Sequence, residues 1–336
     1  MSTLLAGDIG GTKTLLATYE LAQGHLRQQR SERFVSAEWD DFAALVNHYL
    51  KGEAAGARPS HACFAVAGPV RSGRVKLTNL PWQLEEGVLA TRCGLEQVEL
   101  VNDFAVLIYG LPHLQDHQQA LLRSGAAPPD PEAPVAILGA GTGLGVAIGI
   151  PTRQGLKAIP SEASHAEFAP RSDAEWQLKQ WLKADLGLER VSIERVVSGT
   201  GLGEVMRWLL ATDPGAAGHP LAAVEAADRP AATAEAAAAG DALARRAMDL
   251  WLGAYGSTAG DLALQTLCSG GLWVGGGTAE KLLQELRSDT FLQPLLGKGR
   301  LSPVLDQVTV MALTDPEAGV FSAACRARSL MGRVGH

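Results

Sequence analysis

Short apolar runs alternate with polar and glycine-rich segments along the chain, a pattern typical of mixed α/β proteins. Two glycine-rich turns, Gly7–Thr14 and Gly139–Gly145, each follow an apolar run. Each is followed by a second strand-like run rather than by a helix. We therefore predict two strand–turn–strand segments, about one domain apart.

Hydrophobic spacing predicts several further elements. Buried strands are expected at 61–67, 96–101 and 271–274, and helices at 39–50, 174–186 and 317–331. Residues 241–267 have a mainly helical pattern, interrupted by Gly253, Gly256 and Gly260. Ser192 is expected to open another helix, with Glu194 in its first turn. The Ala-, Gly- and Pro-rich segment 212–240 predicts surface loops and short helices.

The glycine turns favour phosphate binding, because successive backbone N–H groups can form a concavity for an anion. Neither common helix-linked fingerprint fits. Thr12 precedes Lys13, whereas a P-loop places the lysine first, and Leu144 stands where a dinucleotide motif has its third glycine. Two such turns predict a duplicated fold with nucleotide between its halves.

Composition narrows the class of protein. The 336 residues suffice for about two domains, and the net charge of −7 argues against a dedicated nucleic-acid surface. No apolar stretch reaches the ~20 residues that span a bilayer, and no signal segment opens the chain. We expect a cytoplasmic protein with no membrane or nucleic-acid partner. The 4 cysteines form no CxxC pair, which predicts free buried thiols.

Asp8 lies inside the first glycine turn, beside the hydroxyl of Thr12. A carboxylate next to a polyphosphate is repulsive unless a cation intervenes. Asp8 is therefore predicted to orient Mg²⁺, through water or through the phosphates. The alternative is an ordinary turn aspartate.

Asn102 and Asp103 follow an apolar strand and precede a helix, a position where open α/β sheets place ligand-binding groups. An aspartate there can accept the proton of an attacking hydroxyl. The alternative is a helix cap, for which both residue types are suited.

Glu162 and His165 are three residues apart in a polar cluster, so one helical turn would bring them to the same ligand. Carboxylate and imidazole are suited to reading neutral hydroxyl groups. A surface loop is the alternative.

Together these segments resemble the bacterial glucokinases of the hexokinase/actin-like superfamily over nearly the whole chain. Asp8–Thr12 resembles the first phosphate motif of that superfamily, and Gly139–Gly145 resembles its second. Gly275–Gly277 resembles its adenosine motif. Further similar segments are Leu100–Phe104, Glu162-x-x-His165, Glu194–Gly199, Lys298–Arg300 and Asp315-Pro316-x-x-Gly319.

The resemblance implies a role for each matching residue. Asp103 would be the catalytic base. The sugar hydroxyls would be held by Asn102, Asp103, Glu162, His165 and Glu194. ATP would be bound by Asp8, Gly10, Gly11, Thr12, Gly141, Thr142, Gly143, Gly275, Gly276 and Gly277, with Mg²⁺ at Asp8.

The resemblance also implies an α/β fold of two domains, hexokinase/actin-like (ribonuclease H-like), with a duplicated mixed β-sheet core and an interdomain cleft. The small domain would be 1–112 plus 315–336, and the large domain 113–314. The expected activity is ATP-dependent phosphorylation of D-glucose to glucose 6-phosphate, feeding glycolysis, by a homodimer. The alternatives are a kinase of another hexose or amino sugar, or a catalytically weak sugar-sensing regulator.

Two segments depart from the family pattern. Ala163 and Ser164 replace a common glycine pair, and their side chains either narrow the sugar pocket or point away from it. Asp261 replaces an asparagine, which turns an amide donor into an acceptor.

Overall fold

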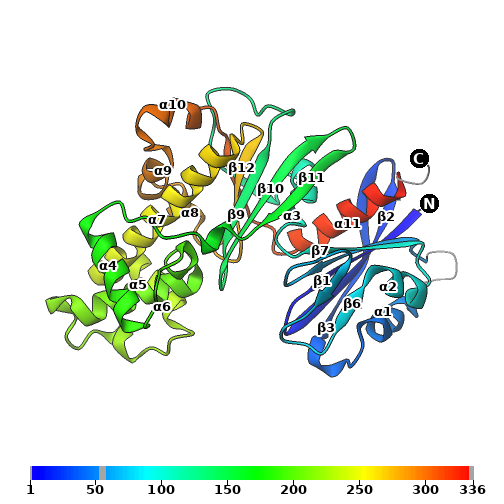
Figure 1. Ribbon diagram of the computed structural model, residues 1–336, viewed down its shortest axis with the longest axis horizontal. Coiled ribbons are helices and arrows are strands. Elements are labelled where there is room, and N and C mark those ends of the chain that lie inside the picture. The colour runs from blue at the N-terminus through cyan, green and yellow to red at the C-terminus, as the bar shows by residue number, and fades with distance from the viewer. Residues whose placement is uncertain (1, 53–57, 333–336) are drawn as a thin grey trace. The chain divides into compact units, whose positions relative to one another are not determined.

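The computed structural model describes residues 2–52 and 58–332, and the chain divides into two compact units (Figure 1). Unit 1 comprises Met1–Gln118, Gly149–Pro160 and Asp315–His336; unit 2 comprises Gln119–Ile148 and Ser161–Thr314. Residues 113–118 and 149–160, which we expected in the large domain, thus belong to unit 1. The division into functional domains itself stays a prediction.

Unit 1 is built on a five-stranded sheet in the order β3-β2-β1-β4-β7. Its strands are β1 (Ser2–Ile9), β2 (Lys13–Ala22), β3 (His25–Val35), β4 (His61–Val66) and β7 (Gln97–Asn102). The first three are antiparallel, whereas β1, β4 and β7 are parallel. The register aligns Ile9, Val66 and Asn102 in one row, so these three strands end at the same edge of the sheet.

Helices cover both faces of this sheet (Figure 1). On one face lie α1 (Phe42–Leu50) and α2 (Glu86–Cys93), whose apolar residues share a core with β1, β2 and β4. On the other lies α11 (Ala318–Met331), which packs against β1, β4 and the short α3 (Leu107–Gly110). A small sheet of β5 (Arg74–Lys76) and β6 (Gln83–Glu85) completes the unit.

A second, six-stranded sheet has the order β11-β10-β9-β12-β13-β8, and most of it lies in unit 2; residues 149–160 of β10 and β11 are grouped with unit 1. Its strands are β8 (Gln119–Arg123), β9 (Val135–Ala140), β10 (Leu144–Thr152), β11 (Gly155–Ser161), β12 (Gly271–Gly275) and β13 (Val310–Leu313). Strands β9, β12 and β13 are parallel, and β8 is antiparallel to β13. The first five positions repeat the order of unit 1, which confirms the predicted α/β fold with a duplicated mixed sheet.

The helices of unit 2 bury most of their apolar residues in one core with β9 and β12. They are α4 (Asp173–Asp185), α5 (Gly199–Thr212), α6 (Arg229–Ala238), α7 (Ala242–Thr266), α8 (Leu283–Leu286), α9 (Asp289–Leu296) and α10 (Ser302–Leu305). Short 3₁₀ turns join them, and segment 212–240, where we predicted surface loops and short helices, contains two of these turns and α6.

Helix α7 corrects one expectation from the sequence. It is a single helix of 25 residues, although glycines were expected to interrupt it. A Cβ at Gly256 or Gly260 would collide with a backbone carbonyl oxygen of α9, that of Phe291 or Leu295. The glycines therefore serve close helix packing, which offsets the roughly 1 kcal/mol that each costs a helix.

The segment after Ser192 is also shorter than expected. Residues Ile193–Arg195 form only a 3₁₀ turn, and the long helix α5 begins at Gly199. The Ser198 hydroxyl accepts a hydrogen bond from Gly201 N at 2.9 Å and so caps α5.

Two further expectations concern cysteines and membranes. All four cysteines are buried and unpaired, as predicted. Within 2–52 and 58–332, no helix is both long and apolar enough to cross a bilayer.

Candidate active site

The first glycine turn, Gly10–Thr12, joins β1 to β2 in unit 1. Ser36 fixes it, since its hydroxyl donates to Gly10 O at 3.2 Å and its N–H donates to Thr12 O at 3.0 Å. Gly10 N closes the turn on Lys13 O at 2.9 Å. In the described part of the chain, no hydrogen bond uses the N–H groups of Gly11 and Thr12, and both residues are exposed. The turn thus has the donors that an anion requires.

Asp8, which we expected inside this turn, lies at the end of β1 just before it and is half-buried. Burial, and next the charge of Asp103, raise the pKa of Asp8 from 3.8 to about 6, although Arg33 lowers it. A Cβ at Gly319, in the first turn of α11, would lie 3.1 Å from Asp8 Oδ2, so the glycine leaves room for this carboxylate. A site that opposes ionisation of a carboxylate in this way favours a bound cation.

Asn102 and Asp103 lie where β7 ends, at the same edge as Asp8. The Asn102 Oδ1 accepts hydrogen bonds from Phe104 N at 3.1 Å and Ala105 N at 3.0 Å, so Asn102 caps the following turn. Its Nδ2 donates to Asp103 Oδ1 at 2.9 Å. The cap that we considered as an alternative is therefore real for Asn102. It holds Asp103 as an exposed, oriented carboxylate.

The second glycine turn, Gly141–Gly143, joins β9 to β10 in unit 2. Its three carbonyl groups all accept hydrogen bonds: Gly199 N donates to Gly141 O, the Thr200 hydroxyl to Thr142 O and Gly141 N to Gly143 O, at 2.7, 3.0 and 2.8 Å. No hydrogen bond among the described residues uses the N–H groups of Thr142 and Gly143. This is the arrangement of the first turn, built from different neighbours.

The predicted adenosine motif lies against this turn. Gly275 ends β12, and its backbone passes so close to β9 that a Cβ at Gly139 would lie 2.6 Å from Gly275 C. Gly276 has φ +83°, which a side chain would strain, whereas a Cβ at Gly277 would meet open space. The turn is fixed by Thr278, whose hydroxyl donates to Ala140 O at 2.8 Å.

Glu162 and His165 come together as predicted, on the 3₁₀ turn Ala163–His165. The Glu162 Oε2 and His165 Nε2 are 3.8 Å apart, and both side chains are exposed, at 80% and 53%. Ser164 is buried, and Ala163 packs against the core of unit 2. No residue of this turn has positive φ. Ser164 is thus covered by the protein, and Ala163 has its apolar contact with the core, whereas Glu162 and His165 are open to solvent.

Glu194 is the residue that links two predicted functions. Its Oε2 accepts a hydrogen bond from Leu144 N at 2.9 Å, directly after the second glycine turn. A Cβ at Gly143 would collide with the same oxygen. A residue predicted to bind sugar is therefore in contact with a turn predicted to bind phosphate.

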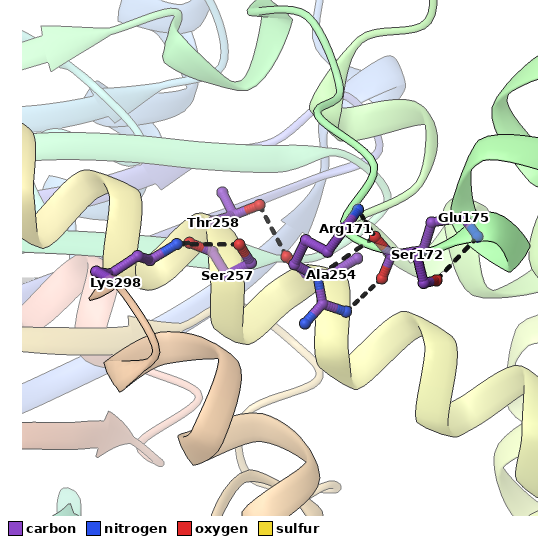
Figure 2. Close-up of polar contacts among 7 residues, drawn as sticks. All are labelled: Arg171, Ser172, Glu175, Ala254, Ser257, Thr258 and Lys298. Atoms are coloured by element: carbon purple, nitrogen blue, oxygen red, sulfur yellow. Dashed lines mark hydrogen bonds and ion pairs between the residues drawn. The ribbon is translucent and has the colours of Figure 1, made fainter. Parts of the chain in front are cut away.

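The departure at Asp261 has a structural partner. Lys298 Nζ donates to Asp261 Oδ1 at 2.6 Å and, as Figure 2 shows, to Ser257 Oγ at 3.0 Å on α7. The carboxylate at position 261 thus accepts a hydrogen bond from the lysine of the family-like segment Lys298–Arg300.

Figure 2 also shows Arg171, which pairs with the buried Glu175 at the start of α4. Both contacts join segments to the helical core of unit 2.

Sequence reasoning missed the supporting residues. Ser36, Thr200 and Thr278 fix the phosphate turns, and Tyr255 OH accepts from Ala140 N at 3.1 Å. Thr200, Tyr255 and Thr278 each stand beside a glycine in the sequence, but that position does not identify the groups they bind, and Ser36 has no such neighbour.

Comparison with solved structures defines the class of protein. A glucokinase from an Antarctic psychrotroph superposes with a TM-score of 0.85 at 29% identity, covering 98% of this chain and 99% of that one. A ROK family glucokinase from Streptomyces griseus, solved with glucose and AMPPNP, shares the fold with a TM-score of 0.61 at 20% identity, covering 97% and 99%. With its paired glycine turns, the chain has the fold of these sugar kinases.

The particular family follows from sequence comparison. The family model described as Glucokinase matches residues 5–330. The glucokinases of Nostoc sp. and Synechocystis sp. are each 39% identical, over 98% and 97% of this chain and 100% and 98% of their own lengths. The chain belongs to the glucokinase family, and its activity is the phosphorylation of glucose.

Proposed function

We propose that Asp103 is the general base of this reaction. The observation that carries the proposal is its exposed carboxylate at the end of β7, oriented by Asn102 Nδ2 at 2.9 Å. A base must be accessible to the hydroxyl whose proton it accepts, and it must be held in place. The edge where parallel strands end is where α/β proteins place such groups.

In the proposed step, the 6-hydroxyl oxygen of glucose attacks the γ-phosphorus of ATP while Asp103 accepts the hydroxyl proton. The new O–P bond forms as the bond from γ-phosphorus to the β,γ-bridging oxygen breaks, which leaves ADP. The N–H groups of Gly11, Thr12, Thr142 and Gly143 stabilise negative charge on phosphate oxygens. Glu162, His165, Glu194 and Asn102 hold sugar hydroxyls away from the reacting one.

Magnesium fits the surroundings of Asp8. Its carboxylate has a raised pKa and a second carboxylate nearby, so a divalent cation would relieve repulsion. In the proposal the metal is held by this one carboxylate, directly or through water, and by the ATP phosphates. When bound, Mg²⁺ would neutralise charge on the phosphates, and Asp8 would orient it.

The family resemblance alone supports the remaining parts of the proposal: a homodimer, a cytoplasmic location and a role in feeding glycolysis. A kinase of another hexose or amino sugar, or a weak sugar-sensing regulator, are the competing functions.

A coupled assay with ATP and Mg²⁺ tests the choice, using glucose, mannose and glucosamine at equal concentrations. We expect the highest kcat/KM with glucose. A higher value with another sugar would assign the enzyme to that sugar. Binding of glucose without turnover would favour the regulator.

A further inference from the structure

A cavity of about 580 Å³ lies in unit 1, outside the candidate active-site residues. Its walls come from Glu99 on β7, Tyr109 on α3, Arg326 on α11 and residues 152–158 of the β10–β11 hairpin. Pockets that bind small-molecule ligands usually have volumes of about 300–1,000 Å³, so this cavity is large enough for one. No role assigned above uses any of these residues.

Arg326 is the buried cation of this cavity, with only 7% of its surface exposed. Its Nη2 donates to Glu99 Oε1 at 2.8 Å, its Nη1 donates to Ser329 Oγ at 3.1 Å, and its guanidinium lies 4.6 Å from the ring centre of Tyr109. Its Nε is buried, and no described residue accepts from it. Leaving a buried donor unpaired is costly, and a guanidinium fixed in this way is suited to binding an anion.

Two further cations line the cavity from the hairpin. Arg153 and Lys157 are exposed, and neither side chain has an ion pair or hydrogen bond with another described residue. Glu99 is the cavity's one lining carboxylate in the described chain, and it is paired with Arg326. The positive charges of Arg153 and Lys157 are therefore uncompensated.

The remaining lining suits a small polar molecule with a charged end. The ring of Tyr109 and the side chain of Leu156 give an apolar surface, and the amide of Gln154 and the hydroxyl of Thr152 are polar. Thr152 also fixes the hairpin turn, because its Oγ1 donates to Gly155 O at 2.6 Å. The cations thus project from an ordered turn.

We propose that this cavity binds a phosphorylated small metabolite of the size of a sugar phosphate. Its phosphate pairs with Arg153 and Lys157 near Arg326, and its body lies between Tyr109, Leu156 and Gln154. A phosphate monoester carries about −1.5 to −2 charges at neutral pH, which matches two uncompensated cations better than a single carboxylate does.

The test is calorimetric titration of the full chain, with saturating glucose, Mg²⁺ and a non-hydrolysable ATP analogue so that the catalytic subsites are occupied. The probes are inorganic phosphate, which carries the recognised group alone, and glucose 6-phosphate. We expect saturable binding of glucose 6-phosphate, weakened at least about tenfold in Arg153→Ala/Lys157→Ala because two charge-assisted contacts are lost.

The matched control is Arg27→Ala/Lys51→Ala, which removes the same charge from exposed positions of unit 1 outside the cavity. Both double variants replace exposed side chains, so both are expected to fold and to phosphorylate glucose normally. Three results would overturn the proposal: no saturable binding of either probe, equal binding by the Arg153→Ala/Lys157→Ala variant, or equal weakening in the control.

Discussion

The two glycine turns are equivalent in the duplicated fold but are supported by different groups. In unit 1, Ser36 binds the carbonyl groups of the turn, and Asp8 lies beside it. In unit 2, the start of α5 binds them, and Glu194 accepts from Leu144 N next to the turn. Each turn leaves two N–H groups without a partner among the described residues.

Because the groups around the two turns differ, we expect the two units to have different roles in the reaction. Of the two carboxylates near the unit 1 turn, Asp8 is suited to binding a cation, and Asp103 is suited to accepting a proton. The carboxylate near the unit 2 turn, Glu194, is predicted to bind sugar, so that turn is coupled to substrate recognition. The two copies of the duplicated fold therefore keep the same anion-binding turn, although the residues around the turn differ between them.

The largest expected effect concerns Asp103, the proton acceptor of unit 1. Asp103→Asn keeps the shape but removes the base, so kcat should fall about 10²–10⁴-fold while glucose affinity changes far less. Steady-state rates and calorimetric glucose binding measure the two quantities. The control is Asp116→Asn, an exposed aspartate of unit 1 that should retain full activity. Normal turnover in folded Asp103→Asn would remove this residue from the mechanism.

The next effect concerns Asp8 and pH. Its pKa is about 6 rather than 3.8, so the folded protein without ATP or metal retains a proton that the unfolded chain has lost. Stability is therefore lost as pH rises from about 4 to 6. Asp8→Asn, which cannot ionise, should be more stable than wild type at pH 8 by up to about 3 kcal/mol.

Urea unfolding with a chelator present, at pH 5 and pH 8, checks the Asp8 prediction. The gain in Asp8→Asn should be larger at pH 8, and activity should be lost. Asp116→Asn serves again as the control, with no gain at either pH. A gain that does not depend on pH would contradict the assignment to Asp8 ionisation.

A smaller effect tests the link between glucose binding and the unit 2 turn. Gly143→Ala would push a methyl group against Glu194 Oε2 and should weaken glucose binding about tenfold, as expected for disturbing a charged hydrogen bond. Gly141→Ala adds its Cβ in open space and should leave glucose binding unchanged. Both are measured by calorimetry without ATP. Equal affinities in the two variants would show that Glu194 is independent of the turn.

The smallest effect concerns the turn that carries Glu162 and His165. Ala163→Gly/Ser164→Gly should lower stability by about 1–2 kcal/mol, because each glycine adds backbone entropy to the unfolded chain. The ratio of kcat/KM for glucose and mannose should not change, since Ser164 is buried and Ala163 packs against the core. Thermal unfolding and steady-state rates check the two parts. A changed ratio would show that Ala163 and Ser164 narrow the sugar pocket.

The sequence predicted what depends on local patterns. The strands around both glycine turns, the strand before Asn102 and the final helix follow hydrophobic spacing, and the pairing of Glu162 with His165 follows from a spacing of three. It did not predict contacts between distant segments. The continuity of α7 depends on α9, the bond from Leu144 N to Glu194 spans 50 positions, and segment 149–160 joins unit 1 through tertiary contacts.

The position of α11 has a consequence for how the protein is made. This helix covers the face of β1 and β4 that α1 and α2 leave open, yet it is synthesised about 200 residues after Gln118. At typical elongation rates of 5–20 residues per second, that interval lasts about 10–40 s. Throughout it, the nascent unit 1 exposes an apolar sheet face built from residues such as Leu4, Ala6 and Cys63. Until α11 emerges and packs on β1 and β4, none of the helices that precede it in the described chain takes its place on this face.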